Sequence, residues 1–232
     1  MAVAKKSTNW FAVWVSAAVV VVLVALGGVV WFLNYQATAP GPAPESAIVN
    51  DETGAISFGS GKDEVDTFVD FMCPICGDFE NQYGEELQTA AANDEITLNI
   101  HPVSILDRYS QNTKYSTRAA NAMYCVAEES PDAALTFFNS LFTNQPEENS
   151  TGLTDDELAS LAEQAGAGAA ADCIADGTYS NFVASQTSSH EIKGTPTVEL
   201  NGTRLDLQAG ELSKLDDLLA GASGGSSGTG GE

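Results

Sequence analysis

The short motif Cys73-Pro74-Ile75-Cys76 constrains this chain more than any other stretch of its sequence. Alternating apolar residues precede the motif and a helical pattern follows it, which predicts a strand that leads Cys73 to the start of a helix. Unpaired backbone N–H groups and the helix dipole stabilise a thiolate there, and the thiolate is the nucleophile of disulfide exchange. The spacing also lets Cys76 attack a mixed disulfide formed at Cys73. We therefore expect thiol–disulfide exchange at this pair.

An uncharged apolar run covers residues 10–33 and is long enough to cross a bilayer as a helix. Lys5 and Lys6, in the short tail of residues 1–9, favour a cytoplasmic N-terminus and an extracytoplasmic position for everything after the run. A cleaved signal peptide is the alternative, with a small-residue site at residues 37–39. The run is longer than a signal h-region, which favours a retained single-pass anchor in the cell membrane.

The charge of the chain argues against one class of partner. Lys5 and Lys6 precede the apolar run, so seven of the nine basic residues and all 32 acidic residues follow it, with a net charge of −25. Such a surface repels nucleic acid and anionic lipid head groups, and we expect no nucleic-acid partner. We interpret the charge as a solvated, self-repelling surface, with steering of basic substrates as the alternative.

The remainder of the chain divides by composition and by hydrophobic pattern. We expect a Pro/Ala-rich spacer, a part with strand patterns, an Ala-rich helical stretch, a second strand-containing part and a disordered Gly/Ser-rich tail: residues 34–50, 51–106, 107–189, 190–220 and 221–232. The second strand-containing part has a hairpin pattern around Asn201-Gly202, which favours a type I′ turn.

The local patterns predict individual elements. Strand patterns fall at residues 55–58, 64–71 and 96–100, and helical patterns at 74–92, 116–126, 131–142, 154–166, 169–175, 179–189 and 211–219. In the first helix, Ile75, Phe79, Tyr83 and Leu87 recur every four residues and predict a buried stripe. In the third, we expect Ser130 as the N-cap and Leu135, Phe138, Leu141 and Phe142 to face inward. Thr154 and Glu157 fit a capping box.

Together these features resemble a known family. A Phe-x-Cys-Pro-x-Cys motif after a strand, a helical insertion and the segment Gly194-Thr195-Pro196-Thr197-Val198 before a hairpin resemble the DsbA-like branch of the thioredoxin superfamily. The stretch from Tyr115 to Ala122 is similar to membrane-anchored DsbA-like proteins of actinobacteria. The resemblance covers about residues 50–220. It implies an α/β, thioredoxin-like fold with a helical insertion domain, here preceded by a single transmembrane helix.

The resemblance also implies roles for residues. Cys73 would be the exposed, attacking cysteine and Cys76 the buried, resolving one. Pro196 would follow a cis peptide bond and lie against the pair, and Thr195 would offer backbone groups to an extended substrate chain. Without the cysteine motif, Pro196 would be interpreted as an ordinary trans proline. No cofactor and no metal are implied.

Two departures from the family pattern concern the site. Ile75 stands where the best-known oxidase has a histidine, so no imidazolium is available to stabilise the thiolate. Thr67 stands six residues before Cys73, where many thioredoxin-like proteins bury an acidic residue. Asp66 or Asp70 could replace that acid, and the sequence does not choose between them.

Cys125 and Cys173 both lie in the helical stretch. In an oxidising compartment we expect a structural disulfide between them, which would contribute roughly 4 kcal/mol in the chain-entropy description. Two buried free thiols and a second redox-active pair are the alternatives.

The leading hypothesis is an extracytoplasmic oxidase that passes its disulfide to exported proteins with free cysteines. The resemblance implies a membrane-bound reoxidising partner, quinone-linked or similar to vitamin K epoxide reductase. A reductase or isomerase that is kept reduced is the second hypothesis, and a chaperone-like or metal-binding module is the third. A metal would need the motif cysteines with His101 or His190, which a single Cys-x-x-Cys favours only weakly.

Overall fold

The computed structural model describes residues 9–225, and the chain divides into two units after Ala39. In the first unit, α1 (Trp10–Thr38) is one continuous helix. Its stretch Val13–Phe32 is the one segment among the described residues that is long and apolar enough to cross a membrane. The helix continues into the predicted spacer, because Pro40 is the first residue that disfavours its continuation.

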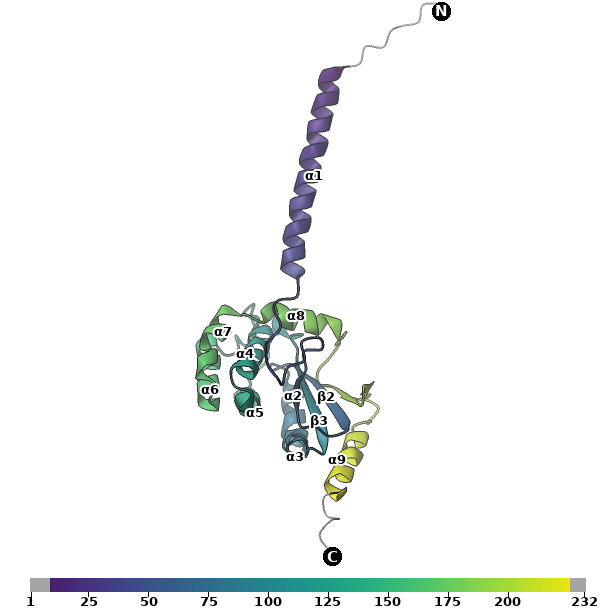
Figure 1. The fold of residues 1–232 in the computed structure, drawn as a ribbon, viewed down its shortest axis with the longest axis vertical. Coiled ribbons are helices and arrows are strands. Elements are labelled where there is room, and N and C mark those ends of the chain that lie inside the picture. Colours follow the sequence, from purple (N-terminus) through teal and green to yellow (C-terminus); the bar gives the residue numbers. More distant parts are fainter. Residues whose placement is uncertain (1–8, 226–232) are drawn as a thin grey trace, which may run out of the picture. The chain divides into compact units, whose positions relative to one another are not determined.

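The second unit, residues 40–232, is built on a five-stranded sheet with the strand order β1-β3-β2-β4-β5 (Figure 1). Strand β2 lies at the centre, parallel to β3 and antiparallel to β4, while β1 and β5 pair antiparallel at the edges. The strands span Ile56–Phe58 (β1), Asp63–Val69 (β2), Ile96–Pro102 (β3), Thr197–Leu200 (β4) and Thr203–Arg204 (β5). This mixed sheet with its helices confirms the predicted fold class.

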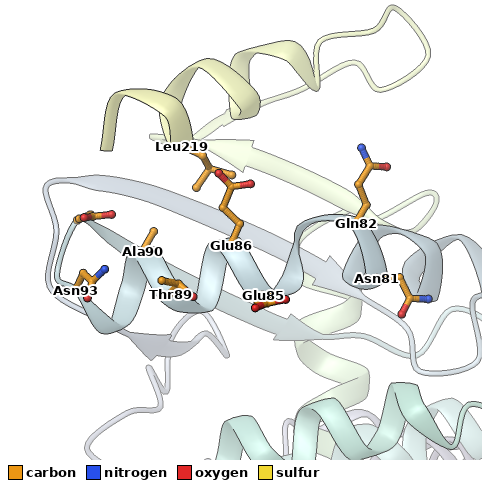
Figure 2. A pocket seen from close by; sticks show the side chains of 9 residues that line it. Asn81, Gln82, Glu85, Glu86, Thr89, Ala90, Asn93 and Leu219 are labelled. Atoms are coloured by element: carbon orange, nitrogen blue, oxygen red, sulfur yellow. The ribbon is translucent and has the colours of Figure 1, made fainter. Parts of the chain in front are cut away.

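The two sides of the sheet differ in polarity. In β2, Val65, Thr67 and Val69 are almost fully buried, whereas Asp66 between them pairs with His101 of β3. Helix α3 (Glu85–Ala92) packs against β3 and against α9 (Ser213–Gly225). Figure 2 shows Leu219 of α9 next to Glu86 and Ala90 of α3, where polar side chains line a surface groove. The α3–α9 pair thus covers one part of the core.

The predicted helix at residues 74–92 is present but is not uniform. It consists of α2 (Pro74–Phe79), a π-helical turn η1 (Glu80–Gly84) and α3. The buried stripe is confirmed for Phe79, Tyr83 and Leu87, but the prediction was wrong for Ile75, which is 63 % exposed. Ile75 lies in the first turn of α2 and borders a surface groove instead of the core.

The insertion is helical throughout its described elements (Figure 1). Its helices are α4 (Tyr115–Glu129), α5 (Ala134–Thr143), α6 (Asp155–Ala165), α7 (Ala171–Asp176) and α8 (Ser180–Ser189), with 3₁₀ turns at Asp107–Tyr109 (η2), Pro131–Ala133 (η3) and Gly168–Ala170 (η4). Helix α4 is buried over most of its length and contacts each of α5, α6, α7 and α8. The insertion and the sheet belong to one compact unit.

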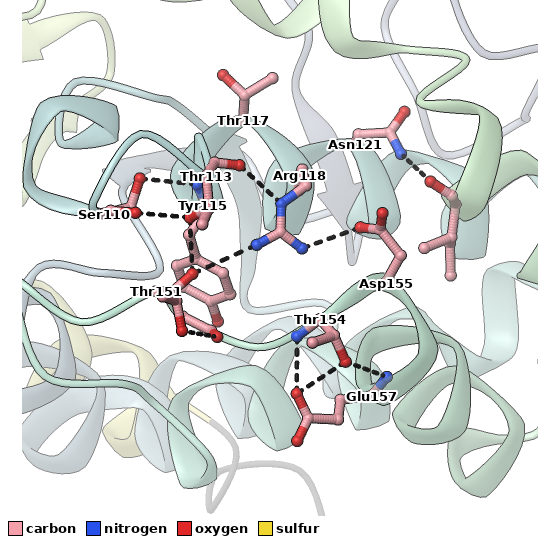
Figure 3. A network of polar contacts seen from close by, with 12 residues as sticks. Ser110, Thr113, Tyr115, Thr117, Arg118, Asn121, Thr151, Thr154, Asp155 and Glu157 are labelled. Carbon is pink, nitrogen blue, oxygen red and sulfur yellow. Dashed lines mark hydrogen bonds and ion pairs between the residues drawn. The ribbon is translucent and has the colours of Figure 1, made fainter.

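A polar network joins α4 to the start of α6 (Figure 3). Arg118 Nη1 donates to Asp155 Oδ1 at 2.9 Å, and Arg118 Nε donates to the carbonyl of Thr113 at 2.9 Å. The predicted capping box is confirmed, since Glu157 N donates to Thr154 Oγ1 at 3.2 Å and Thr154 N donates to Glu157 Oε2 at 2.7 Å. These contacts fix where α6 begins relative to α4.

Other local predictions need correction. Ser130 precedes the 3₁₀ turn η3 and its side chain makes no capping hydrogen bond. In α5, Phe138 and Leu141 are buried as predicted and Phe137 is fully buried too, whereas Leu135 and Phe142 are only half-buried. Helix α9 extends through Gly225 into the predicted disordered tail, and the remaining tail residues, 226–232, lie outside the described residues. The Asn201-Gly202 turn has positive φ at both positions, as a type I′ turn requires.

Candidate active site

Strand pairing brings the two halves of the site together. The end of β2 pairs with the start of β4, with Phe68 opposite Thr197. A short loop leads from β2 to Cys73, the N-cap residue of α2, and the cis peptide bond Thr195–Pro196 precedes β4. Cys73 Sγ therefore lies 3.3 Å from the carbonyl oxygen of Thr195, although 122 residues separate them in the sequence.

The environment of Cys73 favours its thiolate. Both motif cysteines are free thiols, and a hydrogen bond from Cys76 is the main cause that lowers the pKa of Cys73 to about 6. Burial opposes this shift, while Thr195 and the backbone N–H groups of Ile75 and Cys76 add to it. The expected helix-terminus effect is therefore one of several contributions, and the thiol of Cys76 is the largest.

The two cysteines differ less in exposure than expected, and strongly in acidity. Cys73 is 6 % exposed and Cys76 is fully buried, so the expectation of an exposed Cys73 is too strong. Burial raises the pKa of Cys76 well above its ordinary value, and the neighbouring Cys73 sulfur raises it further. At neutral pH the pair therefore holds one thiolate at Cys73 and one thiol at Cys76.

The hydroxyl of Thr195 is buried next to this pair. Its Oγ1 is buried and has no hydrogen-bond partner. A thiolate at Cys73 supplies an acceptor, which explains why the Thr195 side chain lowers the pKa of Cys73. The residue that holds the cis bond thus offers both a carbonyl oxygen and a hydroxyl to the sulfur.

The structure separates the two candidate acids. Asp70 is fully buried beside the motif, where its carboxylate accepts hydrogen bonds from Met72 N and Leu106 N, both at 2.9 Å. Burial raises the pKa of Asp70 to about 6, and the charge of Cys73 contributes in the same direction. Asp66 instead pairs with His101 at 2.8 Å. Asp70 is therefore the buried acid next to the cysteines.

The remaining predicted residues lie apart from the motif. Cys125 of α4 and Cys173 of α7 form a disulfide, with their Cα atoms 5.8 Å apart. His101 and His190 both approach the carbonyl oxygen of Thr53. Within residues 9–225, no group of three or more His, Cys, Asp or Glu side chains is placed to hold a metal ion.

Comparisons with known proteins agree with this geometry. The thioredoxin family model matches residues 56–217. Oxidised DsbA of Mycobacterium tuberculosis is 31 % identical, with a TM-score of 0.62 over 72 % of this chain and 99 % of DsbA. This chain is a DsbA-like member of the thioredoxin superfamily. Like its relatives of that name, it is a protein disulfide oxidoreductase.

Other relatives support the same placement for this DsbA-like chain. The reduced disulfide bond oxidoreductase DsbG of Mycobacterium tuberculosis is 30 % identical, with a TM-score of 0.62 over 76 % of this chain and 95 % of DsbG. The serine/threonine-protein kinase PknE of Mycobacterium tuberculosis is 39 % identical over 118 residues, which cover 49 % of this chain. The match spans about a fifth (21 %) of the kinase, so we do not carry kinase activity over to this chain.

Sequence reasoning missed one residue at the DsbA-like site. Gln145, which follows α5 in the insertion, donates from Nε2 to the carbonyl oxygens of Cys73 at 2.8 Å and Phe71 at 3.3 Å. It lies 72 positions after Cys73 in a loop without a recognisable pattern. The Pro146 that follows it marks a loop but gives no sign of contact with the cysteines.

Proposed function

We propose that this chain is an extracytoplasmic oxidase that donates the Cys73–Cys76 disulfide to exported proteins as they fold. The opposite shifts of the two cysteine pKa values carry the proposal, because Cys73 has a pKa of about 6 and burial raises that of Cys76. A thiolate that is stable at neutral pH stabilises the reduced pair, and a pair with a stabilised reduced form is a strong oxidant. These shifts arise without a histidine in the motif.

The exchange proceeds in two displacements. A substrate thiolate attacks Cys73 Sγ, the Cys73–Cys76 bond breaks, and Cys76 leaves as a thiolate that takes up a proton. A second substrate thiolate then attacks the substrate sulfur of the mixed disulfide, and Cys73 leaves as its stable thiolate. Two electrons pass from the substrate dithiol to the pair. Thr195, whose carbonyl oxygen lies 3.3 Å from Cys73 Sγ, would offer backbone groups to the extended substrate chain.

The compartment follows from the cysteines and from α1. A disulfide between Cys125 and Cys173 is typical of an oxidising environment. Helix α1, with Lys5 and Lys6 before it, would act as a single-pass anchor with the catalytic part outside the cytoplasm. The full chain should then fractionate with membranes and resist extraction by alkaline carbonate, whereas a soluble form that begins near Pro40 would contradict the anchor.

The reduced pair needs an electron acceptor after each cycle. We propose a membrane-bound partner that carries a disulfide of its own and passes the two electrons to a quinone. This partner is either similar to vitamin K epoxide reductase or another quinone-linked protein. An anchor at the same membrane raises the encounter rate between the two proteins. A reductase or isomerase would instead need a partner that supplies electrons, and the two directions are distinguished by the reduction potential.

The decisive experiment measures the reduction potential of Cys73–Cys76 against glutathione and follows the oxidation of a reduced test protein. An oxidase should have a potential less negative than about −200 mV and should transfer its disulfide stoichiometrically. A potential near −270 mV, similar to that of thioredoxin, would reverse the direction to reduction. Absence of any exchange would end the proposal.

A further inference from the structure

One side chain of the insertion forms hydrogen bonds with the turn that carries Cys73. Among the described residues, Gln145 is the residue of the insertion whose side chain forms hydrogen bonds with residues 71–77. Its amide nitrogen donates to the carbonyl oxygen of Cys73 at 2.8 Å and to that of Phe71 at 3.3 Å. These two carbonyls flank Met72 in the turn from β2 to α2, so a single amide group connects both sides of the turn.

Helix α5 fixes the position of this amide. The backbone N–H of Gln145 donates to the carbonyl of Phe142 at 3.2 Å, just beyond the C-terminus of α5. The ring of Phe142 packs against that of Phe71, with their centroids 5.3 Å apart. The same short segment thus contacts the turn through an aromatic pair and through the amide.

Gly77 leaves the space that the amide occupies. A Cβ atom at position 77 would lie 2.4 Å from Gln145 Oε1 and 3.3 Å from the next side-chain carbon, Cδ. Gly77 is buried in α2 and its φ is not positive, so its backbone conformation does not require glycine. A side chain at position 77 would therefore displace the amide end of Gln145.

We propose that Gln145 is a positioning residue for disulfide exchange, which holds Cys73 at the N-terminus of α2 and so keeps its thiolate stable. The inference rests on the proposed function only for its effect on turnover. The effect of Gln145 on the pKa of Cys73 does not depend on which substrate the protein has.

Two physical effects connect the amide with the sulfur. The carbonyl of Cys73 also accepts the N–H groups of Cys76 at 3.0 Å and Gly77 at 3.2 Å, so the bond from Gln145 helps to orient it along the helix axis. In that orientation, the N–H groups of Ile75 and Cys76 face the sulfur, and both lower the pKa of Cys73. The donated N–H also counters the negative end of a carbonyl dipole close to the thiolate.

The first test replaces the amide. Gln145→Ala, and Gln145→Met, which keeps the length of the side chain, should raise the pKa of Cys73 by roughly half a unit to one unit, the size expected for one hydrogen bond. The pKa is measured from thiolate absorbance against pH in a Cys76→Ser background, with each Gln145 variant compared with that background alone. In the otherwise intact chain, disulfide donation should become roughly threefold to tenfold slower. An unchanged pKa in both Gln145 variants would overturn the proposal.

The second test uses Gly77. Gly77→Ala should push the flexible amide aside and raise the pKa of Cys73 in the same direction as Gln145→Ala. In the double variant, Gly77→Ala should add nothing to Gln145→Ala, because the displaced group is already absent. Strictly additive effects on the pKa of Cys73 would show that the two residues act separately and would contradict the proposed positioning role of Gln145.

A matched control comes from a second amide contact between the insertion and the helical segment that begins at the cysteine motif. Gln88 of α3 and Asn139 of α5 exchange two hydrogen bonds of 2.9 Å. Asn139→Ala removes this link, and the pKa of Cys73 should not change. A shift equal to that of Gln145→Ala would reveal general loosening of the insertion instead of local positioning. Wild-type protein that shows the low pKa but no exchange would refute the proposed function and leave the positioning role standing.

Discussion

The chain contains two pairs of cysteines in opposite situations. Cys73 and Cys76 lie three positions apart at the start of one helix, as free thiols whose pKa values shift in opposite directions. Cys125 and Cys173 lie 48 positions apart on two helices of the insertion and are joined by a disulfide. The first pair is next to an unpartnered hydroxyl and to a surface groove lined by Ile75, Thr195 and Pro196, and the second joins helices α4 and α7.

The difference shows that environment, more than the sulfur chemistry, decides what a pair does. A thiolate at Cys73 gains hydrogen bonds from Cys76, Thr195 and backbone N–H groups, so the reduced form is stabilised. Cys125 is 2 % exposed, Cys173 is half-buried, and the bond between them ties α4 to α7, so this disulfide constrains the unfolded chain. The Cys73–Cys76 pair is suited to disulfide exchange, and the Cys125–Cys173 pair is suited to a permanent structural cross-link.

The largest expected effect separates the pairs by activity. Cys73→Ser should abolish oxidation of a reduced test protein, because the attacked sulfur is absent. Cys76→Ser should leave Cys73 able to form mixed disulfides but unable to release them, so trapped complexes should accumulate on non-reducing gels. The double variant Cys125→Ser/Cys173→Ser should retain most of the activity. Full activity in Cys73→Ser would show that Cys73 is not the exchanging cysteine and would contradict the assignment of disulfide exchange to the first pair.

The next effect separates the pairs by stability. Cys125→Ser/Cys173→Ser should lower the free energy of unfolding by roughly 2–4 kcal/mol, since a loop of this length loses substantial entropy when it is closed in the unfolded state. Urea denaturation measures the change, and peptide mass spectrometry of unreduced protein should link the two positions. The matched variant Cys73→Ser/Cys76→Ser should change the free energy of unfolding much less. Equal losses would mean that both pairs are structural.

Much of this contrast was predictable from the sequence. Cys-Pro-x-Cys between a strand pattern and a helical pattern predicts the motif's position, and local rules fix the N-cap residue Cys73 and the Asn201-Gly202 turn. The sheet was also accessible, because β2 alternates in hydrophobicity and a hairpin follows Pro196. These signals are local or have a fixed period, so each can be evaluated without knowledge of the tertiary structure.

The contacts that adjust the site are not local, and the sequence did not reveal them. Gln145 is a polar residue in a loop, and only the packing of α5 against Phe71 places it at the turn. The choice between Asp66 and Asp70 depends on which one the loop after β3 covers, through Leu106. The exposure of Ile75 interrupts a regular stripe, because the first turn of α2 borders a groove instead of the core.

The smallest expected effect separates the pairs by pH dependence. In reduced protein, native Cys73 loses its proton near pH 6, whereas an unfolded thiol keeps its proton until about pH 8.5. The unfolded state therefore binds more protons in this window, and the stability of the reduced form rises with pH and is lost as pH falls through 6. The oxidised form has no such thiol, so the difference between the two forms depends on pH.

Between pH 5 and pH 8, the free energy of unfolding of the reduced form should increase relative to the oxidised form by roughly 1–2 kcal/mol, less than the full shift implies because this window ends below the pKa of an unfolded thiol. Urea denaturation of both forms measures it, with a mild reductant that leaves Cys125–Cys173 intact. Asp70 has a pKa of about 6 in the same window, so an Asp70→Asn background removes its contribution. Parallel curves would mean that Cys73 has an ordinary pKa. Removal of the Cys125–Cys173 bond should shift both curves equally at every pH, because a bonded pair does not titrate.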